Sequence, residues 1–131
     1  MADAIRRLPG DPPSPWEGPN AFSRLVVAGA LVILGGTTSV APNGVVLGAT
    51  PYDQAREILA KIERELARVD GSLAHVIQTR IYVTDISRSE EVGRAHAEAF
   101  SAAPPAMTMV EVSALIDPRM LVEIEAMALL G

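Results

Sequence analysis

The chain has 131 residues, of which 16 are acidic and 11 are basic, and it carries a formal net charge of −5 and no cysteine. This length fits one domain, residues 1–131, because two halves would each be too small to bury an apolar core. The missing cysteines exclude disulfides, thiolate metal sites and cysteine nucleophiles. The acidic balance, without any Lys/Arg cluster, argues against nucleic acid as a partner.

The N-terminal region reads as a proline-rich arm, residues 1–20. Residues 8–20 hold five prolines, so we expect neither a helix nor a central strand there. Residues 1–7 lead into this segment without an apolar stretch, and no run approaches the roughly 18 apolar residues of a membrane helix. We therefore expect a cytoplasmic protein with no membrane partner.

The first strands are expected directly after the arm. Residues 22–34 are apolar and β-branched, and the small residues 28–30 interrupt them. This pattern predicts a tight antiparallel pair of strands, the second of which ends at the glycines 35–36. Residues 42–44, Pro-Asn-Gly, form a turn signal, so residues 45–47 are predicted as a further short strand.

A first helix is predicted between Thr50 and Gly71. Thr50 can cap it, Pro51 suits its first position, and Asp53 completes a variant of the capping box. Apolar residues then recur at helical spacing over residues 55–69, and Gly71 is a typical stop. One apolar stripe of this kind is expected to cover a sheet.

A second helix is predicted over residues 87–100. Ser87 and Glu90 have the spacing of a capping box, and the proline pair 104–105 follows the end of the helix. Its apolar stripe contains His96, and a histidine in such a place is more often a packed, hydrogen-bonded residue than a base or a ligand. This helix should lie beside the first.

Three further strands are predicted at residues 76–84, 106–113 and 120–128. In each of them one alternation is apolar, as expected for the side that the helices cover. The other alternation mixes methionine, leucine and ionisable or polar side chains: Gln78, Arg80, Tyr82, Met107, Met109, Glu111, Leu121, Glu123, Glu125 and Met127.

This second face of the sheet is too apolar for solvent and too charged for the core of a monomer. A subunit interface satisfies both conditions, because buried charges need partners and Arg80 can pair with Glu111 or Glu125. The order of elements predicts an α+β fold in which two helices cover one face of a mainly antiparallel sheet.

Five segments together resemble a known family: residues 18–23, 27–36, 79–85, 104–112 and 122–126. They are similar to the Rid family of reactive intermediate deaminases, the YjgF type, which is often labelled endoribonuclease L-PSP. The match runs from about residue 18 to residue 128. It implies the chorismate mutase-like fold, a homotrimer, and small-molecule ligands in the clefts between neighbouring subunits.

The resemblance also implies roles for individual residues. In the deaminase branch an arginine binds the carboxylate of an imine or enamine derived from an amino acid, and a glutamate positions the water that hydrolyses it. Here Met107 stands at the arginine position and Glu123 at the position of the catalytic glutamate. Phe22 matches an aromatic but lacks its hydroxyl, Gly36 matches a glycine, and Gly93 replaces an asparagine.

The methionine changes the substrate that we expect. An arginine fork makes charge-assisted hydrogen bonds to a carboxylate, each worth roughly 1.5–3 kcal/mol, and a methionine makes none. One function is therefore imine or enamine hydrolysis on an altered substrate. The alternative is a non-catalytic trimer that binds a small metabolite, and endoribonuclease activity ranks behind both because the chain is acidic.

Several candidate residues keep two interpretations. Glu123 either positions water or forms one end of an interface ion pair, and Arg80 either replaces the missing clamp or forms a salt bridge. Met107 and Met109 either line the pocket or fill the seam between subunits. The candidate substrate-binding residues are Phe22, Gly36, Arg80, Met107, Met109 and Glu111.

Other residues support no further site. His75 and His96 are the two histidines, so the sequence offers no credible ligand set for a metal, and no cofactor is expected. Trp16 either covers a neighbour's pocket or caps the core of its own chain.

Overall fold

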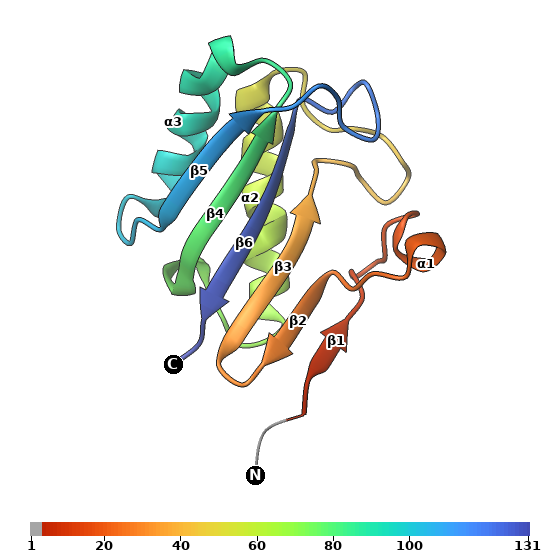
Figure 1. The fold of residues 1–131 in the computed structure, drawn as a ribbon, viewed down its shortest axis with the longest axis vertical. Helices are drawn as coiled ribbons and strands as arrows, with labels where there is room; N and C mark the ends of the chain where they lie inside the picture. Colours follow the sequence, from red (N-terminus) through yellow and green to blue (C-terminus); the bar gives the residue numbers. More distant parts are fainter. Residues whose placement is uncertain (1–3) are drawn as a thin grey trace.

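The computed structural model describes residues 4–131 and contains one six-stranded sheet in the order β1-β2-β3-β6-β4-β5. Its strands are β1 (Arg6–Leu8), β2 (Leu25–Ala28), β3 (Leu31–Thr37), β4 (Val76–Val83), β5 (Ala106–Glu111) and β6 (Val122–Leu129), and its helices are α1 (Glu17–Asn20), α2 (Pro51–Ala67) and α3 (Ser89–Phe100). Neighbouring strands run antiparallel except β4 and β5, which are parallel. Figure 1 shows α2 and α3 behind the sheet, with its opposite face toward the reader. The predicted α+β architecture is therefore confirmed.

The hydrophobic core lies between the sheet and these two helices. Its fully buried side chains come from both layers: Leu25, Val32, Leu34, Ile58, Ile62, Leu66, Ile81, Val83, Val92, Val122 and Ile124. The stripe along α2 is the one that the helical spacing predicted. At its start the Thr50 side chain accepts a hydrogen bond from the Asp53 N–H at 3.1 Å, so the predicted cap is confirmed.

The second long helix begins later than the sequence pattern suggested. Residues 86–88 form a short 3-10 turn, whose first N–H groups are capped by the Asp85 carboxylate through the Ser87 N–H at 3.0 Å. Helix α3 then starts at Ser89. The predicted capping box of Ser87 and Glu90 is wrong, because Asp85, two residues earlier, binds Ser87 itself.

The N-terminal arm contains a short strand and a short helix that the sequence did not predict. Residues 6–8 form an edge strand against β2, and residues 17–20 form a short helix, which corrects the expectation of no helix there. The arm is anchored by Glu17, a buried carboxylate that accepts hydrogen bonds from the Gly10 N–H at 2.8 Å and the Ser14 N–H at 2.6 Å. Residues 1–3 of the predicted arm lie outside the described residues.

The end of the second predicted strand and the short strand predicted after it were both wrong. Strand β3 continues through the glycines 35–36 to Thr37, with a shift of register against β6 after Leu34. Residues 45–47 form no strand, and only an isolated bridge joins Val40 to Val46. The glycines therefore form part of the sheet surface instead of marking its end.

Strand β5 turns its faces the opposite way from the prediction. Its parallel register pairs Met107 with Thr79 and Met109 with Ile81, and both β4 residues are buried on the helix side. Met109 accordingly packs against the core. Assigning Met107, Met109 and Glu111 to the open face was wrong, because both alternations of this exposed edge strand carry apolar residues and the pattern could not choose between them.

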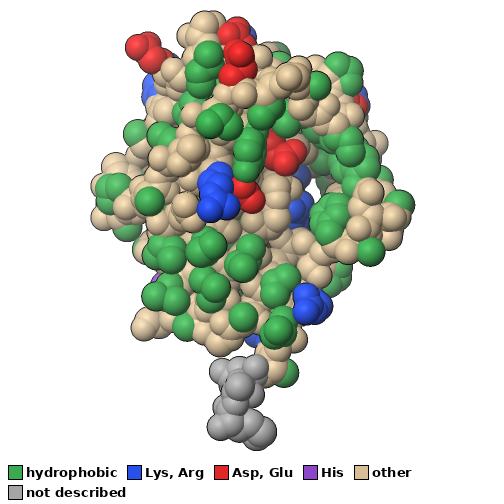
Figure 2. All heavy atoms as spheres, viewed as in Figure 1, with side chains coloured by type: hydrophobic (Ala, Val, Ile, Leu, Met, Phe, Trp, Pro, Cys, Tyr) green, Lys and Arg blue, Asp and Glu red, His purple; other side chains and the backbone are tan. Residues whose placement is uncertain are grey.

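The open face of the sheet is apolar around a small polar centre. Arg80 lies 3.9 Å from Glu125, and the Tyr82 hydroxyl donates a hydrogen bond to the same carboxylate. This confirms the predicted Arg80–Glu125 pair, whereas Glu111 lies on the other face and accepts a hydrogen bond from the backbone of Ile86. Figure 2 shows hydrophobic side chains spread over this face around basic and acidic groups near its middle.

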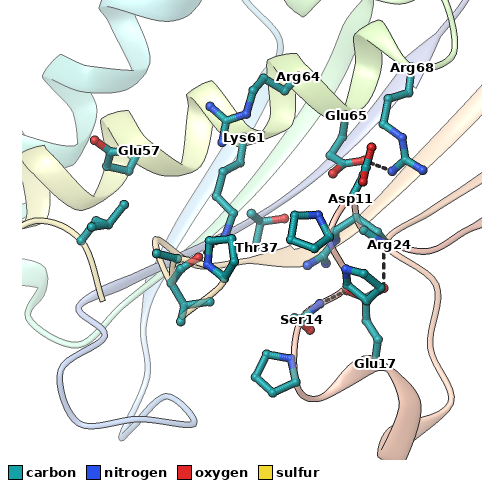
Figure 3. Close-up of a pocket in the computed structure, with 18 residues that line it drawn as sticks. Asp11, Ser14, Glu17, Arg24, Thr37, Glu57, Lys61, Arg64, Glu65 and Arg68 are labelled. Carbon is teal, nitrogen blue, oxygen red and sulfur yellow. Dashed lines mark hydrogen bonds and ion pairs between the residues drawn. The ribbon is translucent and has the colours of Figure 1, made fainter. Parts of the chain in front are cut away.

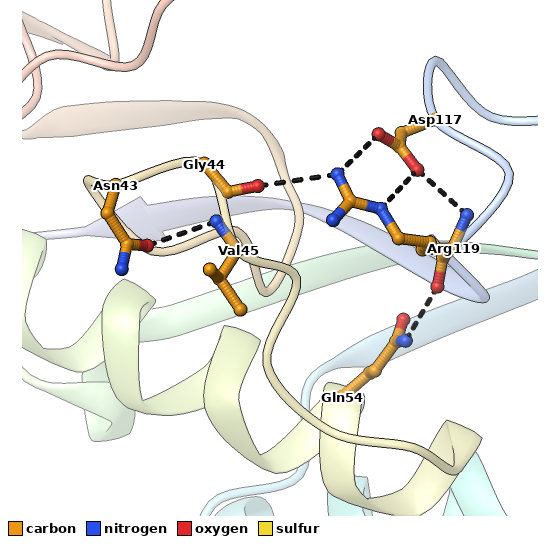
Figure 4. Close-up of polar contacts among 6 residues, drawn as sticks. All are labelled: Asn43, Gly44, Val45, Gln54, Asp117 and Arg119. Atoms are coloured by element: carbon orange, nitrogen blue, oxygen red, sulfur yellow. Dashed lines mark hydrogen bonds and ion pairs between the residues drawn. The ribbon is translucent and has the colours of Figure 1, made fainter.

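A buried amide holds two long loops in place beside the sheet. The side chain of Gln54 donates to the carbonyls of Gly48 at 3.1 Å and Arg119 at 2.9 Å, and it accepts from the Leu121 N–H at 2.8 Å. Arg119 in turn reaches the Gly44 carbonyl (Figure 4). These bonds fix the loop after β3 and the loop before β6, which both border the cavity described next.

Candidate functional site

Glu123 projects from the last strand, on the open face of the sheet, and lies directly over Gly36 of β3. A Cβ atom at residue 36 would collide with the carboxylate of Glu123 and would lie 3.0 Å from its Cδ. Two of the residues that the sequence nominated are thus brought together. The glutamate side chain occupies the space that a Cβ at position 36 would take, so Glu123 keeps this position only opposite a glycine.

A cavity of about 580 Å³ opens beside this pair. Its walls come from the arm, from the residues just before β2, from β3 and the loop after it, from α2, from the loop before β6 and from β6 itself. They include Trp16, Phe22, Arg24, Lys61, Ile116 and Glu123. Figure 2 shows the molecule hollowed between the sheet and the lobe that carries α1. Phe22, Gly36 and Glu123, predicted from separate segments, therefore line one cavity, and so does Trp16.

The remaining nominated residues do not line this cavity. Met107 and Met109 lie on the helix side of β5, and Glu111 shares that side. Arg80 borders a separate shallow hollow of about 40 Å³ on the open face. Within one chain, Met107 and Glu123 therefore lie on opposite faces of the sheet.

The surroundings of Glu123 raise the pKa of its carboxyl group. Burial raises the pKa of this carboxyl group above its ordinary value, the positive charge of Arg24 opposes the rise, and the neighbouring Glu125 adds to it. Within residues 4–131, Glu123 forms no ion pair. A carboxyl group whose pKa is moved toward neutrality and that faces a cavity can exchange protons with a bound molecule.

Arg24 is the cavity residue that the sequence reasoning missed. Its Nη2 donates to the Gly36 carbonyl at 2.6 Å and lies so close to Gly35 that a Cβ there would be 2.8 Å away. Its guanidinium also lies 5.8 Å from the centre of the Phe22 ring. Burial lowers the pKa of Arg24, while the negative charges of Glu17, Glu65 and Glu123 raise it. The sequence did contain one signal for this residue, because Arg24 is the single charged residue in the apolar segment 22–34.

Lys61 reaches the same place from helix α2. Its Nζ donates to the carbonyls of Thr38 at 2.6 Å and Val40 at 2.9 Å. Burial, together with the charges of Arg24 and Arg64, lowers the pKa of this amine to about 8. Nothing in the sequence marked Lys61, because its hydrogen-bond partners are backbone carbonyls of a distant loop.

A second cavity of about 320 Å³ lies on the other side of these two cations, beneath the proline-rich segment of the arm. Arg24 and Lys61 line both cavities. Figure 3 shows the second cavity, with Lys61, Arg64 and Arg68 extending from α2 and with Arg68 paired to Glu65. The two basic side chains thus mark the place where the cavities meet.

Comparison with known proteins assigns the family. Residues 16–130 match the family described as endoribonuclease L-PSP. The chain belongs to this family, which is the YjgF or Rid family. The predicted family resemblance is therefore confirmed.

Similar proteins align with nearly the whole length of the chain. The uncharacterized protein SCO2049 of Streptomyces coelicolor is 33% identical over 130 residues, which cover 99% of this chain and 96% of the relative. Among solved structures, Rv2704 of Mycobacterium tuberculosis, a member of the YjgF/YER057c/UK114 family, is 42% identical with a TM-score of 0.87 over 97% of this chain and 100% of that one. The Rid-family protein YyfA of Yersinia pestis is 27% identical with a TM-score of 0.86, again over 97% and 100%.

Both histidines of this L-PSP family chain make contacts within the fold. The Nε2 of His96 lies 2.8 Å from the Thr79 hydroxyl and its ring packs against Phe100, as expected for a core histidine. His75 accepts a hydrogen bond from the Ser72 N–H in a short turn. In residues 4–131 no three His, Cys, Asp or Glu side chains gather as a metal site. No helix in the same range is long and apolar enough to cross a membrane.

Proposed function

We propose that the chain is an imine or enamine hydrolase of the Rid kind, in which Glu123 acts as the general base and general acid for the attacking water. The observation that carries this proposal is the half-buried carboxyl of Glu123, which faces a cavity, has a raised pKa and lies over a glycine that makes room for it. Water adds to the carbon of the C=N bond, the nitrogen gains a proton, and ammonia leaves as the carbonyl forms. Each proton transfer needs a group that can both accept and donate near neutral pH.

The substrate should differ from that of the deaminase branch. Met107 offers no hydrogen bond to a carboxylate, and it lies on the helix side of an edge strand, 44% exposed. We therefore expect little activity on the enamine formed from serine or threonine.

Assembly into a homotrimer is part of this proposal. On the open face of the sheet, Ile33 is 44% exposed and Leu129 is 51% exposed, near the Arg80–Glu125 pair. Burial between subunits would remove these two apolar side chains from water. Because Met107 and Glu123 lie on opposite faces of one chain, a site that contains both needs two copies. The family resemblance implies such clefts between neighbouring subunits.

The second candidate is a non-catalytic trimer that binds a small metabolite in the same cavity. It is favoured by Phe22, which lines the cavity without the hydroxyl of the family's aromatic residue, and by the absent arginine. An assay that couples ammonia release from a short-lived imine to a spectroscopic signal separates the two. Hydrolysis that disappears in Glu123→Gln supports the enzyme, whereas ligand binding without hydrolysis supports the binding protein.

A further inference from the structure

Two adjacent glycines of β3 accommodate two opposite charges that do not pair with each other. The guanidinium of Arg24 lies over Gly35, and the carboxylate of Glu123 lies over Gly36. Both side chains line the larger cavity, yet in residues 4–131 no ion pair joins them within 4.0 Å. Side chains at positions 35 and 36 would displace both groups. The geometry therefore keeps a cation and a carboxyl group apart on one wall of the cavity.

The hydrogen-bonding capacity of Arg24 is only partly used. A guanidinium has five N–H donors, and one of those on Nη2 is taken by the Gly36 carbonyl at 2.6 Å. Its Nε is buried and has no acceptor within residues 4–131. A buried donor without an acceptor is unfavourable, and an oxygen atom of a ligand at this position would satisfy it.

Lys61 adds a second positive group to the same wall. Its two hydrogen bonds go to carbonyl oxygens and not to a carboxylate, so its charge is not neutralised by a direct partner among residues 4–131. Arg24 and Lys61 both line the two cavities. A small anion placed at their junction would meet both charges in surroundings where burial strengthens the attraction.

We propose that Arg24, assisted by Lys61, binds the carboxylate of a small monoanionic ligand in the cavity that Glu123 lines. Arg24 directly precedes β2, so the anion is held at a different place from the one that residue 107 of β5 would provide. The enamine formed from serine is therefore not expected to lie in the orientation that hydrolysis needs. A planar fork of N–H groups matches a carboxylate. The negative charges of Glu17, Glu65 and Glu123 act on Arg24 and disfavour a ligand with two charges. That the ligand is the substrate rests on the proposed function, whereas the anion site itself does not.

Trp16 makes the test direct, because it is the single tryptophan of the chain and it lines this cavity. Its fluorescence is followed during titration with pyruvate, and with methyl pyruvate as an uncharged probe of similar shape. Neither probe contains an imine, so binding is measured without hydrolysis. The wild type is expected to bind pyruvate at least about tenfold more tightly than the ester, since the charged hydrogen bonds are lost in the ester.

The decisive variant is Arg24→Gln, with Arg88→Gln as the matched control. Both remove one positive charge, but Arg88 pairs with Glu91 on the surface of α3, away from the cavity. Pyruvate affinity should fall by ~10–100-fold in Arg24→Gln and stay unchanged in the control. If Arg24→Gln does not fold by circular dichroism, Arg24→Lys and Lys61→Gln take its place, each with an expected loss of at least about threefold.

Two results would overturn the anion site: equal affinity for pyruvate and its methyl ester, or unchanged pyruvate affinity in the folded cavity variants. Tighter binding of inorganic phosphate than of pyruvate would overturn its preference for a carboxylate with one charge. The outcome is distinguishable from that of the hydrolase proposal. Arg24-dependent pyruvate binding in a protein that releases no ammonia from imines supports the anion site and removes the enzymatic role. If the protein hydrolyses imines but binds pyruvate no more tightly than methyl pyruvate, the enzymatic role is supported and the anion site is removed.

Discussion

The carboxylate of Glu123 fills the space above Gly36 that a side chain at residue 36 would need. Gly36 has no positive φ angle that would require glycine, so its lack of a Cβ serves the glutamate and not the backbone. The position of one β6 side chain thus depends on the smallest possible residue on β3. This dependence can be tested by adding one methyl group at residue 36.

Gly36→Ala should displace Glu123 and remove most of the hydrolysis that we propose. The atoms that the new methyl group meets are at the end of the flexible Glu123 side chain, which can turn away. The loss of unfolding free energy should therefore stay below the roughly 1–3 kcal/mol of an overpacked core, as a urea titration measures. Gly93→Ala is the control, because a Cβ there meets nothing within 4 Å in the middle of α3. It should stabilise the fold by about 0.5–1 kcal/mol. Full activity in Gly36→Ala would show that the glutamate position does not matter.

The open sheet face should mediate trimer formation. Light scattering at micromolar concentration should give three chains for the wild type and a smaller species for Ile33→Glu, because Ile33 lies 44% exposed on that face and is paired with Met127. Ile86→Glu is the control, since Ile86 is 42% exposed in the turn before α3. A monomeric wild type, or an Ile33→Glu protein that stays trimeric, would contradict this interface.

Met107→Arg should raise activity on imines derived from amino acids. If the cleft keeps the geometry of the deaminase branch, each 1.4 kcal/mol of recovered transition-state binding gives about tenfold in rate. The double variant Met107→Arg/Glu123→Ala should lose the gain. Glu111 lies on the same side of β5 and can capture the new guanidinium instead. A trimeric Met107→Arg protein without any gain would favour the binding-protein alternative.

The amine of Lys61 should make stability rise with pH in the alkaline range. The pKa of this amine is about 8 in the fold and 10.5 in its ordinary state, so the unfolded chain binds more protons between these two values. Unfolding free energy therefore increases from pH 8 to 10.5 through this group. The Lys61→Met variant should lack that component, which parallel urea titrations at pH 7.5, 9 and 10.5 would reveal. A wild-type pH profile identical to that of the variant would contradict the lowered pKa.

The local elements that have their own sequence signals were predictable. Thr50 and Pro51 start α2 as expected, because a cap depends on residues three apart and not on the rest of the fold. The orientation of β5 was not predictable, since Met109 and Val110 are both apolar and only the parallel register with β4 decides which faces the helices. Glu111 was misplaced for the same reason.

In the candidate site, only the residues that match motifs of the Rid family were predicted from the sequence. Phe22, Gly36 and Glu123 were nominated from separate segments and line one cavity. Arg24 and Lys61 were missed, because their partners are backbone carbonyls of residues that only the folded chain brings near them. Side chains that bind backbone oxygen leave no complementary residue type in the sequence.

The most direct test of the account is the rate of ammonia release from a short-lived imine in the wild type and in Glu123→Gln. The amide keeps the shape of the side chain over Gly36 but cannot act as a general acid or base near neutral pH. The account predicts a loss of about 10²–10⁴-fold, the usual contribution of a general acid–base group. Glu91→Gln is the control, because Glu91 pairs with Arg88 at the start of α3 and does not line the cavity, so its loss should leave the rate unchanged. Equal rates for wild type and a folded Glu123→Gln protein would contradict the central role of Glu123.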